Sequence, residues 1–331
     1  MGVHALTAGH SRYLIVGGAG FIGSHFTDRL LADAGVAAVT LYDNFSSGRE
    51  WHFQCHLDDP RLKVVRADVK DQDRLTETAR RHDLVIHLAS NPDIALAANQ
   101  PAIDFDEGTA LTHHVVEAMR ISGCRRLLYA SGSGIYGDLG ELEINEDHGP
   151  LVPISTYGAS KLAGEAIIAA YCHMFDLSAC IFRLGNVVGA RQTHGVGFDF
   201  IRGLLTEPSR LDILGDGRQS KSYIHVDDVI SAVLQANAGS AVKYNVFNVA
   251  SGDYITVKEI ADLAVECAGL STERVEYRFS GGERGWKGDV PVVRFDTGRI
   301  RKLGWKCRHS SRQALRRSLE ALIEDVRAGN R

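Results

Sequence analysis

The feature that most constrains the fold is a glycine-rich turn that directly follows a short apolar run. The run is YLIV at residues 13–16, and the turn GGAGFIG places its glycines in the spacing G-x-x-G-x-x-G. Glycine permits a tight turn, a close approach of backbone N–H groups to a pyrophosphate, and close packing of the next helix on the strand. The start of that helix also favours an anion. The pattern therefore predicts a strand, turn and helix that bind a dinucleotide through Gly17, Gly20, Phe21, Ile22 and Gly23.

Acidic residues follow two of the next strands expected along the chain. Asp43 ends the second strand, twenty residues after Gly23, where a carboxylate accepts hydrogen bonds from both hydroxyls of an adenosine ribose. An acid at this place disfavours a 2′-phosphate, so NAD is preferred over NADP. Asp68 and Val69 follow the third strand, and we expect Asp68 to accept the adenine amino group, with a turn or N-cap role as the alternative. The end of the fourth strand, expected beneath the cofactor, is Leu88, Ala89 and Ser90.

Short β-rich runs alternate with helical stretches from residue 12 to about residue 180, a pattern typical of a parallel sheet covered on both faces. The predicted fold class is α/β, a doubly wound Rossmann sheet, over residues 12–185. Beyond it, glycine-rich loops predict a smaller mixed α/β substrate-binding lobe over 186–331, with parts of 215–250 returning to the first domain. Residues 1–11 are predicted to be a loose leader. Strands are expected at 13–16, 38–42, 62–66, 84–88, 127–130 and 178–182, and helices at 21–34, 72–81, 110–121, 156–175, 226–238, 256–268 and 311–326.

The composition is that of an ordinary globular protein, with 44% hydrophobic and 24% charged residues and a formal net charge of -4. Basic residues are spread along the chain, so we expect no nucleic-acid partner. No apolar stretch approaches the roughly 20 residues that span a bilayer, and no secretory signal pattern is present, so we expect a cytoplasmic protein with no membrane partner. The six cysteines form no C-x-x-C pair and no zinc-type cluster. They are therefore expected to be reduced thiols, and no metal site is predicted.

A tyrosine and a lysine open one of the longest predicted helices, in the segment YGASK from Tyr157 to Lys161. Their four-residue spacing places both side chains on one face, one helical turn apart. A nearby lysine cation and a positive nicotinamide ring both favour the phenolate, which lowers the pKa of the tyrosine from its usual value of about 10 toward working pH. A surface pair on a helix is the alternative. Because the pair follows a dinucleotide turn in the same chain, we predict that it is catalytic.

These segments resemble the extended short-chain dehydrogenase/reductases. The similarity rests on GGAGFIGSH, YDNFSSG, HLAS, SGSGIYGD, YGASK, RLGNVVGA and SYIHVDD, which span nearly the whole chain. The chain is most similar to the UDP-glucose 4-epimerase branch, whose members oxidise a sugar carbon with tightly held NAD and return the hydride to the other face of the keto intermediate. The resemblance implies NAD-dependent epimerisation of a nucleotide-diphosphate sugar. It also implies a homodimer that pairs helices 110–121 and 156–175.

The resemblance implies roles for individual residues as well. Tyr157 acts as general base and then as general acid, while Lys161 lowers the pKa of Tyr157 and binds the nicotinamide ribose. The adenosine and pyrophosphate are lined by Asn44, Ser47 and Gly48. The residues implied at the diphosphate of the sugar nucleotide are Asn186, Lys221, Arg284 and Lys287.

Two positions depart from the family pattern near the expected chemistry. The family's active-site Ser or Thr lies four residues before the tyrosine of its SxxxVYG-type motif, and that position, counted back from Tyr136, is Gly132. Ser133 is the expected catalytic stand-in, with Ser131 as a further substrate contact, although successive residues of an extended chain point to opposite sides. Gly108 stands where relatives commonly carry an active-site Asn. Two lost side chains predict room for a bulkier sugar, such as a higher-carbon or substituted one; a shifted loop with ordinary hexose chemistry is the alternative.

Two other functions remain open. Dehydratases and decarboxylases on this scaffold need a further acid/base after the Ser/Thr position, where this chain has Ser133 and Gly134, so epimerisation is preferred. A non-catalytic NAD-binding redox sensor is favoured only by the hydroxyl missing at residue 132, and the Tyr/Lys pair argues against it. Trp286 and Trp305 are candidates for stacking on the nucleotide base, although packing is the commoner role of tryptophan.

Overall fold

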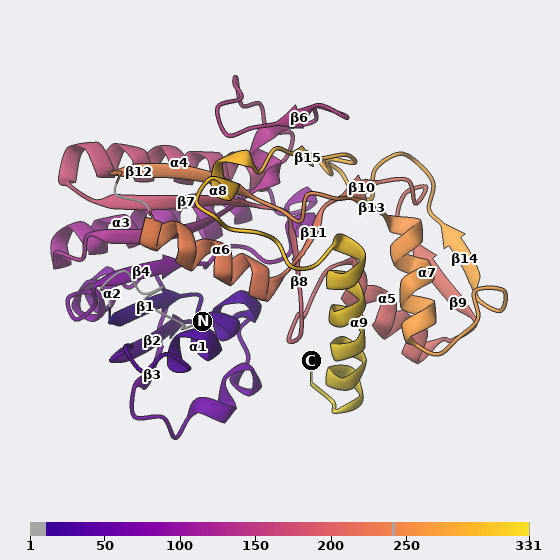
Figure 1. Cartoon of the computed structure of the whole chain (residues 1–331), viewed down its shortest axis with the longest axis horizontal. Helices are drawn as coiled ribbons and strands as arrows, with labels where there is room; N and C mark the ends of the chain where they lie inside the picture. The colour runs from indigo at the N-terminus through magenta and orange to yellow at the C-terminus, as the bar shows by residue number, and fades with distance from the viewer. Residues whose placement is uncertain (1–10, 240–241, 331) are drawn as a thin grey trace.

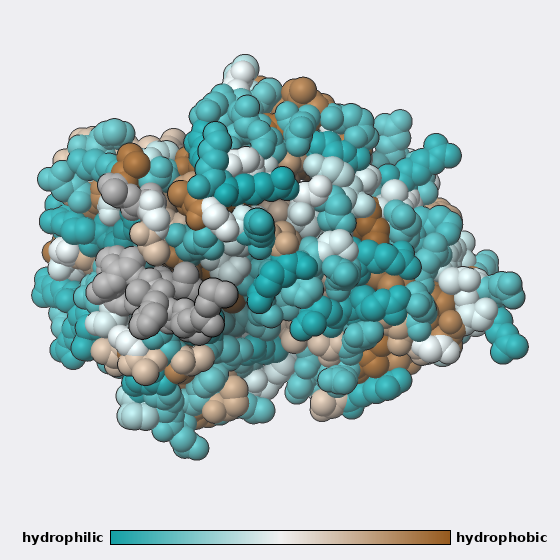
Figure 2. Space-filling view, in the orientation of Figure 1, coloured by the Kyte–Doolittle hydropathy of each residue, from teal (hydrophilic) through white to brown (hydrophobic). Residues whose placement is uncertain are grey.

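The computed structural model describes residues 11–239 and 242–330, so the leader expected at residues 1–11 lies outside the described residues except for Ser11. Figure 1 shows a central sheet flanked by helices, with a smaller lobe on one side formed by the C-terminal part of the chain. Within the described ranges, no helix is both long enough and apolar enough to cross a membrane. The face drawn in Figure 2 is mostly hydrophilic, with small separate hydrophobic areas.

The central sheet contains seven parallel strands in the order β12-β7-β5-β4-β1-β2-β3. The α/β doubly wound fold predicted from the sequence is therefore confirmed, together with its six predicted strands. The seventh strand, β12, was not singled out by the sequence pattern, which predicted only that parts of 215–250 return to the first domain. The division of the chain at residue 185 stays a prediction. The strands are β1 (Arg12–Val16), β2 (Ala38–Asp43), β3 (Leu62–Arg66), β4 (Leu84–His87), β5 (Arg126–Gly132), β7 (Ser178–Leu184) and β12 (Tyr244–Val249).

Helices cover both faces of this sheet. Along β1, Tyr13 and Ile15 point to the face covered by α1 and α6, whereas Leu14 and Val16 point to the face covered by α2, α3 and α4. All four side chains are 0% exposed, which explains why the strand is a continuous apolar run. Each such Leu, Ile or Val contributes roughly 1.5–3 kcal/mol by leaving water. The helices are α1 (Phe21–Leu31), α2 (Gln72–Ala79), α3 (Ala110–Ser122), α4 (Thr156–Phe175) and α6 (Val226–Gly239).

The smaller lobe has a hydrophobic core of its own, formed mainly by three helices and the strand β9. Two of these helices begin with a capping box, Thr256 with Glu259 and Ser310 with Gln313, which satisfies N–H groups at the helix start. The helix α5 lies in the glycine-rich stretch and was not predicted. The lobe and its connections contain α5 (Val196–Thr206), α7 (Val257–Cys267), α8 (Gly298–Arg301), α9 (Ser311–Arg327), β6 (Glu143–Ile144), β8 (Asn186–Val188), β9 (Arg210–Ile213), β10 (Ser220–Lys221), β11 (Tyr223–His225), β13 (Ile255–Thr256), β14 (Glu276–Phe279) and β15 (Arg294–Phe295).

Candidate active site

The glycine turn between β1 and α1 is packed closely at both ends and open at its front. Gly17 has φ +82°, and a Cβ added there would lie 2.7 Å from the backbone nitrogen of Ala89; a Cβ at Gly23 would lie 2.7 Å from the carbonyl oxygen of Gly17. At Gly20 the nearest atom to an added Cβ is that same oxygen, at 3.3 Å. Gly20 also begins α1 without any side-chain cap, and the first turn carries no acidic residue. These features fit the pyrophosphate of a dinucleotide.

Asp43 holds this turn from the end of β2. Its carboxylate is 8% exposed and accepts hydrogen bonds from the backbone N–H groups of Ala19, at 2.9 Å, and Phe45, at 2.8 Å. Gly48 packs closely here, because an added Cβ would lie 2.8 Å from the Cβ of Ala19. A carboxylate has about four lone-pair sites, so Asp43 can still accept ribose hydroxyls while it supports the turn.

The remaining residues expected at the adenosine gather around Asp68. One oxygen of its carboxylate accepts the side-chain amide of Asn44 at 3.1 Å, and the other accepts the backbone N–H of Lys70 at 2.9 Å. Val69 is buried, and Ser47 is partly buried. Asp71, rather than Asp68, is the N-cap of α2. A turn role of Asp68 and an adenine contact are both compatible with this geometry, so the adenine contact stays a prediction.

Tyr157 and Lys161 lie in the first turns of α4, which is capped by the side chain of Ser155. The Nζ atom of Lys161 donates to the carbonyl oxygen of Ala130 at the end of β5, at 2.9 Å, and lies 5.6 Å from the ring centre of Tyr157. Tyr157 forms a side-chain hydrogen bond with Ser90, which lies three residues after the end of β4. The predicted pair therefore meets the carboxyl ends of β4 and β5, the edge at which open α/β sheets bind ligands.

Burial dominates the electrostatics of this pair. It raises the pKa of Tyr157 to about 12, against the hydrogen bond from Ser90 and with the help of the negative charge of Asp104. Burial also lowers the pKa of Lys161 to about 8, against the charges of Glu165 and Asp104. The lowering of the pKa of Tyr157 by Lys161 and a nicotinamide ring together stays a prediction, because burial sets the direction of the shift in the chain without its cofactor. Desolvation of the phenolate outweighs a lysine that is hydrogen-bonded to a backbone carbonyl.

The two glycines that depart from the family pattern differ in their surroundings. A Cβ added to Gly132 would have nothing nearer than Cε1 of Tyr157, at 4.0 Å, so the missing side chain leaves space beside the phenol. A Cβ added to Gly108 would lie 2.3 Å from Oγ of Ser160. The prediction of free space at Gly108 is therefore wrong, because Ser160 of α4 already occupies that space. Ser133 begins a short 3-10 turn directly after Gly132 and stays a predicted catalytic hydroxyl.

Ser131 does not contact the substrate site as expected. Its hydroxyl donates to Oε1 of Glu165 at 2.5 Å, and the residue is 4% exposed. Glu165 in turn forms a buried ion pair with Arg183 at 2.8 Å, and Arg183 donates to the hydroxyl of Tyr136 at 2.9 Å. Sequence reasoning missed this network. Its only signal was an acid four residues after Lys161 on the same helix.

Two of the three cations expected at the substrate diphosphate are paired with acids of the chain. Lys221 forms an ion pair with Asp289 at 2.5 Å. Arg284 donates to the carbonyl oxygen of Asp289 and forms an ion pair with Asp138 at 2.6 Å. Lys287 is exposed. Two of the four predicted residues, Lys221 and Arg284, therefore meet at Asp289, an acid that sequence reasoning did not consider.

One further side chain was expected on the substrate side, and two tryptophans were candidates for stacking on the base. Asn186 begins β8 and is partly buried, so its substrate contact stays a prediction. The ring of Trp286 lies 5.0 Å from Nζ of Lys221, and its buried Nε1 has no hydrogen-bond partner in the described part of the chain. Trp305 is 2% exposed and donates to Oγ of Ser231 at 3.0 Å. Trp305 is thus a core residue rather than a base-stacking one.

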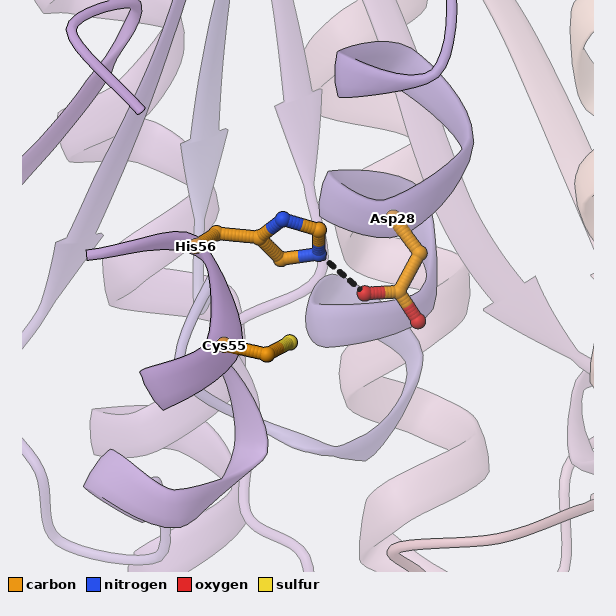
Figure 3. A group of neighbouring side chains, drawn as sticks. All are labelled: Asp28, Cys55 and His56. Atoms are coloured by element: carbon orange, nitrogen blue, oxygen red, sulfur yellow. Dashed lines mark hydrogen bonds and ion pairs between the residues drawn. The ribbon is translucent and has the colours of Figure 1, made fainter. Parts of the chain in front are cut away.

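One group of potential metal ligands lies on α1 and the turn of Gln54–His56, where Figure 3 shows Asp28, Cys55 and His56 facing one another. His56 bonds one carboxylate oxygen of Asp28 at 2.7 Å, and Arg191 forms an ion pair with the other. These contacts hold the pKa of Asp28 below its ordinary value even though burial opposes them. Both oxygens are thus used within the protein, and we assign the group a structural role.

A doubly wound sheet with an open glycine turn, an acid at the end of β2 and a Tyr/Lys pair at the edge of the sheet defines an NAD-dependent enzyme of the short-chain dehydrogenase/reductase class. The sequence pattern of the NAD dependent epimerase/dehydratase family matches residues 13–250. The chain belongs to this family.

Relatives within the family include both epimerases and dehydratases. A putative UDP-glucose 4-epimerase of Methanocaldococcus jannaschii is 30% identical, covering 92% of this chain and 96% of the relative. A crystal structure of a UDP-galactose 4-epimerase is 34% identical with a TM-score of 0.84, covering 95% of this chain and 99% of the other. A dTDP-glucose 4,6-dehydratase of Streptomyces venezuelae, solved with NAD bound, is 26% identical with a TM-score of 0.87, covering 95% and 97%. The family, the fold and NAD as cofactor are thereby established.

Proposed function

We propose that this chain epimerises the sugar of a nucleotide diphosphate at C4. The observation that carries the proposal is the pair of residues that follows Gly132 beside Tyr157. Elimination across the neighbouring carbon needs an additional acid/base at that place, and Ser133 and Gly134 carry no carboxylate. Oxidation followed by return of the hydride needs only the phenol. The epimerases named above support the same conclusion.

The chemistry divides simply between the chain and its cofactor. NAD, when bound, accepts a hydride from the sugar carbon and gives it back. The Oη atom of Tyr157 takes the proton of the sugar hydroxyl and later returns it, while the hydrogen bond with Ser90 orients the ring. Lys161, held by the carbonyl of Ala130, keeps its charge below a pKa of about 8 and so favours the phenolate when the proton is taken.

The diphosphate is assigned to the group around Asp289. Lys221 and Arg284 supply positive charge there, and a phosphate that enters would exchange with Asp289 and Asp138 as their partner. The space at Gly132 supports a substituted sugar, although the room expected at Gly108 does not contribute.

A panel of nucleotide sugars tests the proposal. UDP-glucose, UDP-galactose, UDP-N-acetylglucosamine, UDP-glucuronic acid and UDP-arabinose are incubated separately with the purified protein, and the products are read by proton NMR. We expect conversion of at least one of them to its C4 epimer. A 4-keto-6-deoxy product would instead establish a dehydratase. If no sugar reacts and the Tyr157→Phe variant keeps full cellular function, the chain is a redox sensor.

Assembly and location belong to the same proposal. We infer a homodimer through α3 and α4, supported by Met174, which is 70% exposed at the end of α4, and by Ile121, which is 46% exposed at the end of α3. A cytoplasmic location is supported by the six cysteines, all of which are free thiols. The mass of the protein in solution tests the dimer.

A further inference from the structure

Asp104 is a buried carboxylate beside the catalytic helix, and the proposed chemistry gives it no part. It is 1% exposed and directly precedes Phe105–Thr109, a turn with π-helical hydrogen bonding. Such turns frequently accompany functional sites. The described residues place no Lys, Arg or His within ion-pair distance of this carboxylate. A buried charge of this kind is costly unless several hydrogen bonds hold it.

Three hydrogen bonds tie Asp104 to both sides of the catalytic tyrosine. Its Oδ2 accepts the hydroxyl of Thr156 at 2.6 Å, and its Oδ1 accepts the side-chain amide of Asn91 at 2.9 Å. Its backbone carbonyl accepts the hydroxyl of Ser160, also at 2.6 Å. Thr156 and Asn91 are the chain neighbours of Tyr157 and Ser90, respectively. One carboxylate therefore joins the first turn of α4 to the segment after β4, and these are the two segments between which the phenol is held.

The charge of Asp104 also acts on the catalytic pair. It raises the pKa of Tyr157, although burial is the larger cause of that rise. It also raises the pKa of Lys161, which burial lowers. Glu165, further along α4, is already paired with Arg183 of β7.

Two further titratable side chains, on β4 and β5, face this pair. His87 is neutral because burial lowers its pKa to about 3, and burial raises the pKa of Tyr129 far above its ordinary value. Asp104 is therefore a negative charge near the phenol that forms no ion pair within the described residues, and Lys161 is the cation whose pKa it raises.

We propose that Asp104 is a positioning residue that fixes Tyr157 between Ser90 and the first turn of α4 and that keeps its phenol protonated until a positive charge is brought to the site. The inference deepens the proposed function and rests on Tyr157 being its acid and base. In this arrangement the carboxylate and Lys161 offset one another. The phenol then ionises in response to the charge of the nicotinamide ring rather than to the pH of the solution.

Two variants separate the charge of Asp104 from its hydrogen bonds. Asp104→Asn removes the charge, whereas Thr156→Val keeps the charge and removes one hydrogen bond. In each background the tyrosinate absorbance of the NAD-loaded protein is titrated with pH, and the same titration of the matching Tyr157→Phe variant is subtracted, which leaves Tyr157 alone.

We expect Asp104→Asn to lower the pKa of Tyr157 by about one pH unit, and Thr156→Val to leave it unchanged. For an epimerised sugar, Thr156→Val should lower kcat about tenfold with little change in KM, because the phenol is misplaced. An unmoved pKa in Asp104→Asn overturns the charge role, and wild-type kcat in Thr156→Val overturns the positioning role.

The titration uses no sugar, so it decides the charge role even if the proposed epimerisation fails. If Asp104→Asn does not fold, Asp104→Glu keeps the charge, and we expect it to retain the wild-type pKa of Tyr157 while lowering kcat. A pKa lowered in Asp104→Glu would contradict the proposal.

Discussion

The proposed cofactor side of the site is formed mainly by backbone, whereas the proposed substrate side carries charged side chains that pair with one another. Around NAD, the approaches of Gly17 and Gly23 and the hydrogen bonds to Asp43 fix a turn whose front stays open. On the substrate side, Lys221 and Arg284 are paired with acids of the chain. The first arrangement binds without rearrangement, while the second must exchange ion partners. We therefore expect cofactor binding to be tight and permanent and substrate binding to be adjustable.

The largest loss of activity should come from replacing Tyr157, which lies between the proposed cofactor and substrate sides. Tyr157→Phe removes the proton acceptor without changing the volume of the ring, so kcat should fall about 10²–10⁴-fold. The NAD content should stay that of the wild type, because the glycine turn is untouched. Tyr171→Phe is the matched control, since its hydroxyl bonds Glu117 away from the site. Turnover by Tyr157→Phe within a few-fold of wild type would contradict its assigned role.

The next largest effect, on NAD affinity, tests the glycine turn alone. Gly20→Ala adds a methyl group at the open front of the turn, where only the oxygen of Gly17 is near, so the protein should fold but lose NAD affinity at least tenfold, about 1.4 kcal/mol. The measurement is NAD retained after dialysis, together with the melting temperature of the cofactor-free protein. Gly203→Ala in α5, where an added Cβ meets only Leu211 at 3.9 Å, should change neither. Equal NAD retention in both variants would show that the turn does not hold the pyrophosphate.

A smaller effect, on substrate binding, tests the charged side chains of the proposed substrate side alone. Lys221→Met removes a cation from the group around Asp289, so KM for the nucleotide sugar should rise about tenfold while kcat and NAD content change little. Lys243→Met is the control, because Lys243 pairs with the exposed Asp176. An unchanged KM would show that the diphosphate does not bind at Lys221.

The smallest expected effect is a dependence of the activity on pH, which arises from Lys161 and not from the glycine turn or the group around Asp289. The pKa of Lys161 is lowered to about 8 by burial, so Lys161 is charged below that pH and neutral above it. Activity should therefore fall as pH rises through about 8, since the charge that favours the phenolate is lost. The pH profile of kcat measures this. A rate that keeps rising to pH 9 would show that Lys161 retains its charge in the loaded enzyme.

The same contrast explains what the sequence could predict. Local patterns gave the glycine turn, the strands of the sheet and the pair Tyr157 and Lys161, because spacing along one element determines them. The partners of Ser131 and Lys221 are Glu165 and Asp289, which are 34 and 68 residues away in the chain. Contacts at such separations leave no local signal.

One error and one omission follow from the same cause. Room was expected at Gly108 because a side chain is missing there, yet Ser160 of a distant helix fills it. Asp104 carried no motif, and only the fold brings it beside the first turn of α4. Sequence reasoning thus predicted the elements that carry the proposed cofactor side, but not the long-range partners on the proposed substrate side.

The most direct test of the account follows the hydrogen at C4 of the sugar. A UDP-sugar deuterated at C4 is incubated with the purified protein in ordinary water, with no NAD added, and the epimer is analysed by mass spectrometry and NMR. If bound NAD takes the hydride and returns it at a site closed by Tyr157, the epimer keeps its deuterium at C4. An epimer that has exchanged this deuterium for hydrogen from water would contradict the account.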